Sequence, residues 1–327
     1  MVSIAAATIL RLFREAGTNF VSGALISREL QVSRTAVWKH INGLRDAGYV
    51  IEAVPSRGYH LLSTPNILSE EEVRERLHAT VIGQRLVCLP GTASTNADAF
   101  RMAEAGADEG TVIIADAQSG GKGRMGRVWS SPPGINLYCS VVLRPTVKPY
   151  EAAQLTFLSA VAVARAIEQT TQLKPEIKWP NDVLIQGRKV AGLLNEMSAE
   201  TDGINFVILG IGVNLNMTAA QFPADLRTPA TSLLLEQGRP VSRAQFAAAM
   251  LDELDRLYDA FLTHGFGPVR EEWQLRCNAN GREVSVSDGG AETLRGMFEG
   301  LDGDGAMLVR LPGGMLERIL CGDVRVI

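Results

Sequence analysis

Apolar residues near the start of the chain first follow the spacing of helices and then that of strands. Residues 4–16, 22–30 and 34–46 predict three helices, because their apolar positions recur every three or four residues. The buried candidates among them are Ile4, Leu10, Phe13, Val37, Ile41 and Leu44. Residues 49–54 and 58–62 predict two strands joined by a short turn. This succession of elements predicts a winged helix-turn-helix.

The third predicted helix turns a polar and cationic face away from its apolar stripe. In a helix-turn-helix the N-terminal turns of that helix enter the major groove and present base-reading side chains. The first 62 residues hold seven cations and four anions, a balance of +3, whereas the whole chain carries −4. We therefore expect a DNA-binding module, with a winged helix used only for protein contacts as the alternative. The candidate contacts are Gly23, Ser33, Arg34, Thr35, Trp38, Lys39, His40, Asn42 and, at the tip of the wing, Arg57.

The middle of the chain mixes the two spacings, as expected for a sheet crossed by helices. Strands are predicted at residues 85–89, 111–116, 136–143, 177–179 and 206–213. Helices are predicted at residues 68–77, 97–105, 155–169 and 242–264. The strand over 136–143 is expected to alternate along its length, and the helix over 68–77 has a capping-box spacing between Ser69 and Glu72.

The last fifty residues change to short strands separated by turns rich in glycine and aspartate. The strands are predicted at residues 283–287, 293–301, 306–310, 315–320 and 324–327. Such a run is typical of a small β-barrel. We therefore expect an α+β multidomain protein with domains at residues 1–64, 66–272 and 273–327, the first two joined by the linker Ser63-Thr64-Pro65-Asn66.

Composition says more about the cellular compartment in which the protein is expected than about its function. The four cysteines, Cys88, Cys139, Cys277 and Cys321, lie far apart without a C-x-x-C pair, which favours reduced thiols. The first ten residues lack the basic start of a signal peptide, and no apolar run is long enough to span a membrane. We therefore expect a cytoplasmic protein without membrane contact.

A glycine-rich basic loop over residues 121–127 is the most distinctive stretch of the chain. Its spacing satisfies G-x-G-x-x-G, but a dinucleotide fingerprint needs a helix to open at the loop. Pro132-Pro133-Gly134 follows instead, and a helix interior does not tolerate it. A flexible basic loop that covers an anionic ligand fits better than a Rossmann motif, and a plain solvated surface loop is the alternative.

Four other motifs accompany this loop in a fixed order along the chain. They are Ser94-Thr95-Asn96 with Gln118, Lys178-Trp179-Pro180-Asn181-Asp182, Lys189-Val190-Ala191-Gly192 and Gly210-Ile211-Gly212-Val213-Asn214. Taken alone, the first could simply cap a helix and the second could be an ordinary turn. The glycines of the last motif permit close approach of a flat group. Together with the loop, this set closely resembles the biotin protein ligases over residues 66–327, and the preceding segment resembles the bifunctional members that also repress biotin operons.

The resemblance implies a fold and a reaction. The central domain would resemble class II aminoacyl-tRNA synthetases, and the C-terminal domain would be an SH3-like β-barrel. The protein would use ATP with Mg²⁺ to convert biotin to biotinyl-5'-AMP, then transfer biotin to a lysine of the biotin carboxyl carrier protein of acetyl-CoA carboxylase. The adenylate would also act as corepressor, favouring a homodimer that binds operator DNA.

The resemblance also implies a role for each motif residue, while it names no metal ligand. The catalytic residues would be Lys178, Asp182, Lys189 and Arg124. The biotin-binding residues would be Ser94, Thr95, Asn96, Gln118, Lys122, Gly123, Arg124 and Lys189. The ATP-binding residues would be Arg127, Trp129, Asn181, Asp182 and Asn214. Lys122 and Met125 depart from the family pattern, since many repressor-ligases carry arginines there.

The chemistry of the motifs is consistent with joining a carboxylate to a phosphate. Such a reaction brings two anions together, so the site must supply positive charge and hold the groups in line. The motif cations can do this, whereas no P-loop is present and all four histidines lie outside the motifs. Two alternatives stay open: a biotin-sensing repressor without significant turnover, and a relative of the lipoate ligases.

Overall fold

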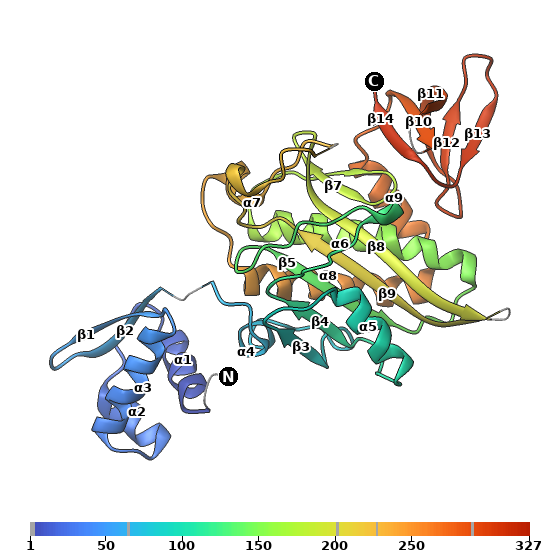
Figure 1. Ribbon diagram of the computed structural model, residues 1–327. Helices are drawn as coiled ribbons and strands as arrows, with labels where there is room; N and C mark the ends of the chain where they lie inside the picture. Colours follow the sequence, from blue (N-terminus) through green and yellow to red (C-terminus); the bar gives the residue numbers. More distant parts are fainter. Residues whose placement is uncertain (1–3, 64–65, 201–202, 227, 289–290) are drawn as a thin grey trace. The chain divides into compact units, whose positions relative to one another are not determined.

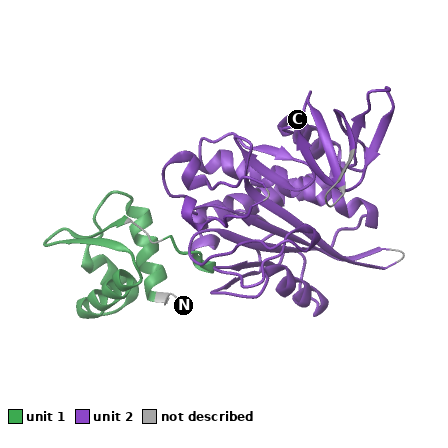
Figure 2. Ribbon diagram, turned by 45° about the horizontal axis from the view of Figure 1, so that its top comes forward, with its two compact units in different colours: residues 1–71 green, residues 72–327 purple. Residues whose placement is uncertain are grey.

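The computed structural model describes residues 4–63, 66–200, 203–226, 228–288 and 291–327. The chain forms two compact units, Met1–Glu71 and Glu72–Ile327, which are coloured separately in Figure 2 and are described one at a time below. We call the first the head and the second the body. Thr64 and Pro65 of the expected linker lie outside the described residues.

The head contains the predicted helices and hairpin in the predicted order (Figure 1). Its elements are α1 (Ile4–Ala16), α2 (Gly23–Leu30), α3 (Arg34–Asp46), β1 (Val50–Val54) and β2 (Gly58–Ser63). The hydroxyl oxygens of Ser22 and Ser33 accept hydrogen bonds from backbone N–H groups in the first turns of α2 and α3. The helix-turn-helix and its hairpin are thus confirmed.

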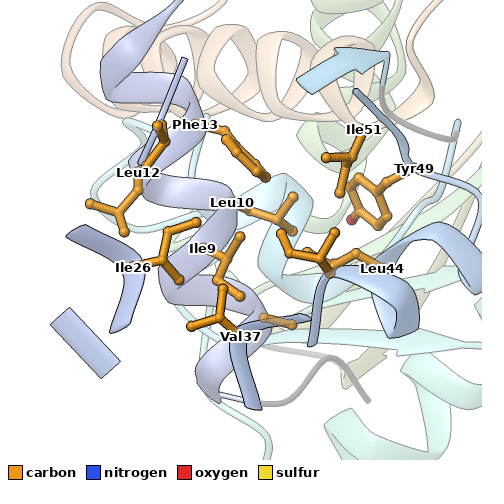
Figure 3. Packing of buried hydrophobic residues seen from close by; sticks show 12 residues of the cluster. Ile9, Leu10, Leu12, Phe13, Ile26, Val37, Leu44, Tyr49 and Ile51 are labelled. Atoms are coloured by element: carbon orange, nitrogen blue, oxygen red, sulfur yellow. The ribbon is translucent and has the colours of Figure 1, made fainter. Parts of the chain in front are cut away.

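The core of the head joins all three helices to the hairpin (Figure 3). Ile9, Ile26 and Ile41, one from each helix, are fully buried, and Tyr49 and Ile51 close the cluster from the hairpin side. The hairpin is also tied to the loop before α2 by two backbone hydrogen bonds between Val21 and Tyr59, of 2.8 and 2.9 Å. The wing is therefore held against the helices by both packing and backbone pairing.

The body is built on a seven-stranded mixed sheet with the order β3-β4-β5-β9-β8-β7-β6 (Figure 1). Its strands are β3 (Leu86–Leu89), β4 (Val112–Ala115), β5 (Leu137–Leu143), β6 (Glu176–Lys178), β7 (Asp182–Ile185), β8 (Arg188–Glu200) and β9 (Gly203–Val213). Only β3 and β4 run parallel, while the other neighbouring pairs are antiparallel. Gln186 and Gly187 both have positive φ and make the tight turn from β7 to β8.

Helices cover both faces of this sheet. α5 (Thr95–Glu104) packs through Ala99 and Ala103 on β4, β5 and β9. α6 (Gln154–Thr170) covers the other face, backed by α8 (Arg243–His264), and the chain also forms α4 (Glu70–Arg74), α7 (Leu233–Gln237) and α9 (Gly267–Arg276) (Figure 1).

Two expectations about these elements were wrong. The strand β5 does not alternate, because all seven of its residues are buried between the two helical layers. The helix expected over residues 68–77 is only five residues long, and the buried Glu72 forms an ion pair with Arg76, 2.9 Å away.

A second sheet of five antiparallel strands ends the body, in the order β13-β12-β11-β10-β14. Its strands are β10 (Glu283–Asp288), β11 (Ala291–Leu301), β12 (Met307–Arg310), β13 (Leu316–Ile319) and β14 (Asp323–Val326). The indole N–H of Trp179, just after β6, donates to the carbonyl oxygen of Gly305 in this region at 3.3 Å. No helix in the described part of the chain is long and apolar enough to cross a membrane.

Candidate active site

A cavity of about 610 Å³ opens where the N-terminus of α5 meets the sheet. All the biotin-binding, ATP-binding and catalytic candidates chosen from the sequence line it. They are Ser94, Thr95, Asn96, Gln118, Lys122, Gly123, Arg124, Arg127, Trp129, Lys178, Asn181, Asp182, Lys189 and Asn214. The basic loop and the four other motifs, spread over more than a hundred residues, therefore share one cavity.

Glycines on β8 and β9 make the floor of the cavity. A Cβ atom on Gly212 would lie 2.6 Å from the indole ring of Trp129, and one on Gly192 would lie 2.8 Å from the same ring. A Cβ atom on Gly210 would overlap the side-chain amide of Asn96. The glycines do admit a flat group, as the sequence suggested, but at Gly212 that group is the protein's own indole.

The side chains at the start of α5 form a polar cluster. Ser94 occupies the N-cap position but makes no side-chain capping bond, so capping does not explain this motif. The backbone N–H of Thr95 donates to Gln118 Oε1 at 2.9 Å, and Gln118 Nε2 donates to Ser131 Oγ at 3.0 Å. Asn96 Nδ2 donates to Glu196 Oε2 at 2.7 Å. The cluster is built in advance of any ligand.

The basic loop folds back on itself as a small hairpin. The N–H of Trp129 donates to the Gly121 carbonyl at 2.9 Å, and that of Gly123 donates to the Arg127 carbonyl at 2.7 Å. Positive φ occurs at Met125 and Gly126, whereas Gly121 is required for space, since a Cβ there would lie 2.6 Å from the Trp129 carbonyl oxygen. The loop thus carries its cations on an ordered turn.

The cations of the cavity are arranged around one carboxylate. Lys189 Nζ lies 2.6 Å from Asp182 Oδ1 and 5.3 Å from the centroid of the Trp129 ring. Burial lowers the pKa of Lys178, and the neighbouring carboxylate of Asp182 opposes this shift. Arg124 Nη1 donates to Asn181 Oδ1 over a long 3.4 Å contact. The wall next to β6 and β7 therefore carries the cations Lys178, Lys189 and Arg124 together with the carboxylate of Asp182.

Two nucleotide-side candidates are engaged within the protein. Arg127 forms a two-pronged ion pair with Asp323 of β14, which lines the same cavity, and this hydrogen-bonded pair lowers the pKa of Asp323. Asn214 Nδ2 donates to the Thr231 carbonyl at 3.1 Å. In the described residues, no group of three or more His, Cys, Asp or Glu side chains is placed to hold a metal ion.

The DNA-binding candidates of the head lie on and around the N-terminal half of α3. Arg34, Thr35, Trp38 and Lys39 are exposed, while His40 and Asn42 are half-buried. Ser33 caps α3, Gly23 begins α2 close to the Tyr59 ring, and Arg57 at the wing tip stacks on Phe20 with its guanidinium 4.1 Å from the ring centroid. The candidates from α3 and the wing belong to one compact module.

Comparisons with known proteins agree with both the ligand cavity of the body and the helix-turn-helix of the head. Residues 89–214 match the Biotin/lipoate A/B protein ligase family, residues 6–60 match an HTH domain, and residues 280–326 match the Biotin protein ligase C terminal domain. The chain is 40% identical over 322 residues to the bifunctional ligase/repressor BirA of Bacillus subtilis (strain 168), with 97% of each chain covered. The chain belongs to the bifunctional ligase/repressor family of biotin protein ligases.

Lower identities are found for a second bifunctional relative and for a solved structure. The bifunctional ligase/repressor BirA of Escherichia coli (strain K12) is 31% identical over 299 residues, covering 91% of this chain and 90% of its own. Among solved structures, the biotin protein ligase from Aquifex aeolicus in complex with biotin and ATP superimposes with a TM-score of 0.64 at 28% identity, covering 75% of this chain and all of that chain.

Four residues of this site were missed by sequence reasoning. Ser140 and Glu196 hydrogen-bond to the α5 cluster from β5 and β8, Ser131 holds Gln118, and Asp323 holds Arg127. The single serine within the apolar run of β5 was a usable signal for Ser140. Nothing local could have identified Asp323, which lies 196 residues from its partner.

Proposed function

We propose that the chain activates biotin with ATP to give biotinyl-5'-AMP and transfers biotin to a lysine of a biotin carboxyl carrier protein, and that it also represses biotin synthesis genes. Family membership supports both activities. The observation that carries the ligase assignment is the convergence of all its motif residues on one cavity of about 610 Å³, a volume in the range of small-molecule sites.

In the first step a biotin carboxylate oxygen attacks the α-phosphorus of ATP, and pyrophosphate leaves. Lys189, Lys178 and Arg124 supply the positive charge that this encounter of anions requires. Asp182, 2.6 Å from the Lys189 ammonium, holds that cation in place before the substrates arrive. In the second step a carrier lysine amine attacks the acyl carbonyl, and AMP leaves.

The polar cluster at α5 suits the head group of biotin. We assign hydrogen bonding of the cyclic urea to Ser94, Thr95 and Gln118, and closure over the valeryl chain and acyl phosphate to the loop residues Lys122, Gly123 and Arg124. Asn96 also belongs to this end of the cavity. The nucleotide would lie toward Trp129, Asn181, Asp182, Asn214 and Arg127, with Mg²⁺ carried by its phosphates.

For the head we propose sequence-specific contact with the operator through Arg34, Thr35, Trp38, Lys39, His40 and Asn42, with phosphate contact by Arg57. Gly23 and Ser33 would approach the backbone at the starts of their helices. The adenylate would act as corepressor by favouring a homodimer, because two linked heads then engage a two-fold operator.

At the level of fold we propose a central domain of the class II aminoacyl-tRNA synthetase type and a C-terminal SH3-like barrel. The mixed sheet covered by helices and the five antiparallel strands support this. We keep domain limits at residues 1–64, 66–272 and 273–327, although α9 continues to Arg276 before the chain enters β10.

Exchange of labelled pyrophosphate into ATP tests the proposed function. We expect exchange with biotin and none above background with lipoate or octanoate, because the α5 cluster offers hydrogen bonds that only a polar head group uses. Equal exchange with octanoate would point to the lipoate-ligase alternative. Biotin binding without exchange of pyrophosphate would instead support the alternative of a biotin-sensing repressor without significant turnover.

A further inference from the structure

Two polar side chains lie behind the cavity and are not part of its lining. They form hydrogen bonds to residues that do line it. Ser140, on β5, is fully buried, and its Oγ lies 2.6 Å from Asn96 Oδ1 and 2.8 Å from Thr95 Oγ1. Glu196, on β8, accepts a hydrogen bond of 2.7 Å from Asn96 Nδ2, which also donates to the Leu194 carbonyl at 3.1 Å. A continuous chain of hydrogen bonds therefore runs from Glu196 to Thr95.

Glu196 and Leu194, at one end of this chain of hydrogen bonds, determine which atom is the donor in each bond. The Glu196 carboxylate and the Leu194 carbonyl are acceptors only, so the Asn96 amide must turn its NH₂ toward them and its oxygen toward Ser140. An amide oxygen cannot donate, so the single hydroxyl hydrogen of Ser140 lies on the 2.6 Å bond to Asn96. Ser140 must then accept at its other contact, so the single hydroxyl hydrogen of Thr95 points into the protein, either to Ser140 Oγ at 2.8 Å or to Gln118 Oε1 at 3.1 Å.

The hydroxyl of Thr95 consequently faces the cavity as an acceptor. Its one hydrogen is used inside the protein, and only oxygen lone pairs are left for a ligand. Beside it, Gln118 accepts from the Thr95 N–H through Oε1 and donates one amide hydrogen to Ser131. The second N–H of that amide has no partner among the residues that the structure describes, so it is available as a donor.

We propose that Ser140, backed by Asn96 and Glu196, is a positioning residue that acts together with Gln118 Oε1 to hold the Thr95 hydroxyl as an acceptor toward the cavity, and so makes the cavity selective for a ligand with an N–H group at that point. An acceptor at Thr95 beside a donor at Gln118 complements an N–H next to a C=O, as in a cyclic urea. This inference rests on the proposed function and deepens it, because it names what selects the biotin head group.

Three full-length proteins and three ligands test the proposal. The proteins are wild type, Ser140→Ala and Ser159→Ala; Ser159 is a matched control, since it is also fully buried but donates to its own helix on the Leu155 carbonyl. The ligands are biotin and the two cyclic carbamate analogues in which one or the other ureido N–H is replaced by oxygen. Dissociation constants are measured by titration calorimetry without ATP, and thermal melts check folding.

Wild type should bind biotin about tenfold to a hundredfold more tightly than one of the two carbamates. In that carbamate the ring oxygen replaces the N–H and faces the Thr95 hydroxyl oxygen, so that two acceptors meet in a buried site. In Ser140→Ala the Thr95 hydroxyl loses the nearer of its two internal acceptors and keeps only Gln118 Oε1, 3.1 Å away, so it turns more easily to donate to the ring oxygen. We therefore expect this preference to fall several-fold, while Ser159→Ala retains it. If Ser140 had a purely structural role, Ser140→Ala would weaken the binding of biotin and carbamate equally. The ratio of their dissociation constants would then stay unchanged.

Should Ser140→Ala not fold, Ser140→Cys keeps the volume with a weaker donor and acceptor and should show an intermediate preference. An unchanged ratio in a folded Ser140 variant, or a wild type indifferent to both carbamates, overturns this proposal while leaving the ligase assignment intact. A wild type that binds none of the three ligands removes the proposed function, and this proposal with it.

Discussion

The polar side chains of α3 in the head and those of the cavity in the body are held in opposite ways. Arg34, Thr35 and Lys39 are exposed, and none of them has a side-chain partner within the described part of the chain. In the cavity, by contrast, Asn96 is committed to three protein groups and Lys189 to Asp182. The start of α3 thus presents these three side chains unpaired, whereas the cavity presents Asn96 and Lys189 already paired.

This difference corresponds to two kinds of ligand. DNA brings a dense row of phosphates and releases counterions, so long mobile cations can find their partners on contact. A small ligand must instead be oriented for attack, and groups fixed before binding lower the cost of that orientation. If this contrast is correct, substitutions in the cavity should be severe and specific, and substitutions on the head should be milder and depend on salt.

The largest expected effect is at Lys189. Lys189→Gln should lower adenylate formation by about 10²–10³-fold, the usual loss when one electrostatic stabiliser of a transition state is removed. Pyrophosphate exchange measures the rate, and a thermal melt measures stability. Lys174→Gln, at an exposed position before β6 and away from the cavity, is the control and should behave as wild type. Unchanged turnover with a lowered melting temperature would give Lys189 a structural role only.

A smaller loss is expected at Arg124, which lies on the loop and makes one long hydrogen bond, to Asn181, among the residues that the structure describes. Charge-assisted hydrogen bonds contribute about 1.5–3 kcal/mol each, so Arg124→Gly should speed escape of the adenylate by about tenfold to a hundredfold. Escaped adenylate would then label lysines of bystander proteins. Trapping of radiolabelled adenylate by gel filtration gives its dissociation rate, and a wild-type rate in the variant would remove this role.

On the head, two arginines should behave differently. Arg34→Ala should cost about 1–3 kcal/mol of operator binding and relax specificity at one position of each half-site, whereas Arg57→Ala should weaken all sequences alike and reduce the salt slope by about one. Mobility-shift titrations at several salt concentrations, on operator and on scrambled DNA, separate the two. Identical profiles for both variants would contradict the assignment of α3 to base reading.

The smallest effect is expected for the ion pair between Arg127 and Asp323, because both side chains are more than a third exposed. The hydrogen bond from Arg127 lowers the pKa of Asp323, so its contribution to stability is present above the unfolded pKa of about 3.9 and is lost as the pH falls through the folded value. Asp323→Asn should therefore destabilise the body by no more than about 1 kcal/mol at neutral pH. The free energies of unfolding of wild type and Asp323→Asn should become equal in acid, below the range where Asp323 titrates. A stability difference that persists there would exclude this linkage.

The same contrast explains how far the sequence could predict the structure. The head is built from local signals, namely apolar spacing and the caps Ser22 and Ser33, and its elements were predicted almost to the residue. The motif residues of the cavity were also found, because glycines and cations mark them in the sequence. The resemblance to a known family, not periodicity, brought those motifs together.

What the sequence did not predict depends on partners far along the chain. Capping of α5 by the Ser94-Thr95-Asn96 motif was one of two open interpretations, yet Ser94 makes no capping bond and the neighbouring hydroxyl and amide groups bond to Gln118, Ser140 and Glu196. The strand β5 was expected to alternate, because a single strand does not indicate that helices will cover both of its faces. Both points concern contacts that exist only after the sheet has formed.

The central claim is that one chain carries two separable sites, a paired and preformed ligase cavity and a free-standing DNA-reading surface. Its most direct test deletes residues 1–64 and measures two activities in matched preparations of intact and shortened protein: biotin transfer to a carrier-domain lysine and binding to the promoter of the organism's own biotin genes. We predict that the shortened protein keeps most of its transfer rate and loses operator binding at every salt concentration, while the intact protein binds more tightly when biotin and ATP are both present. A folded shortened protein that no longer transfers biotin, or an intact protein that binds no DNA, would contradict the account.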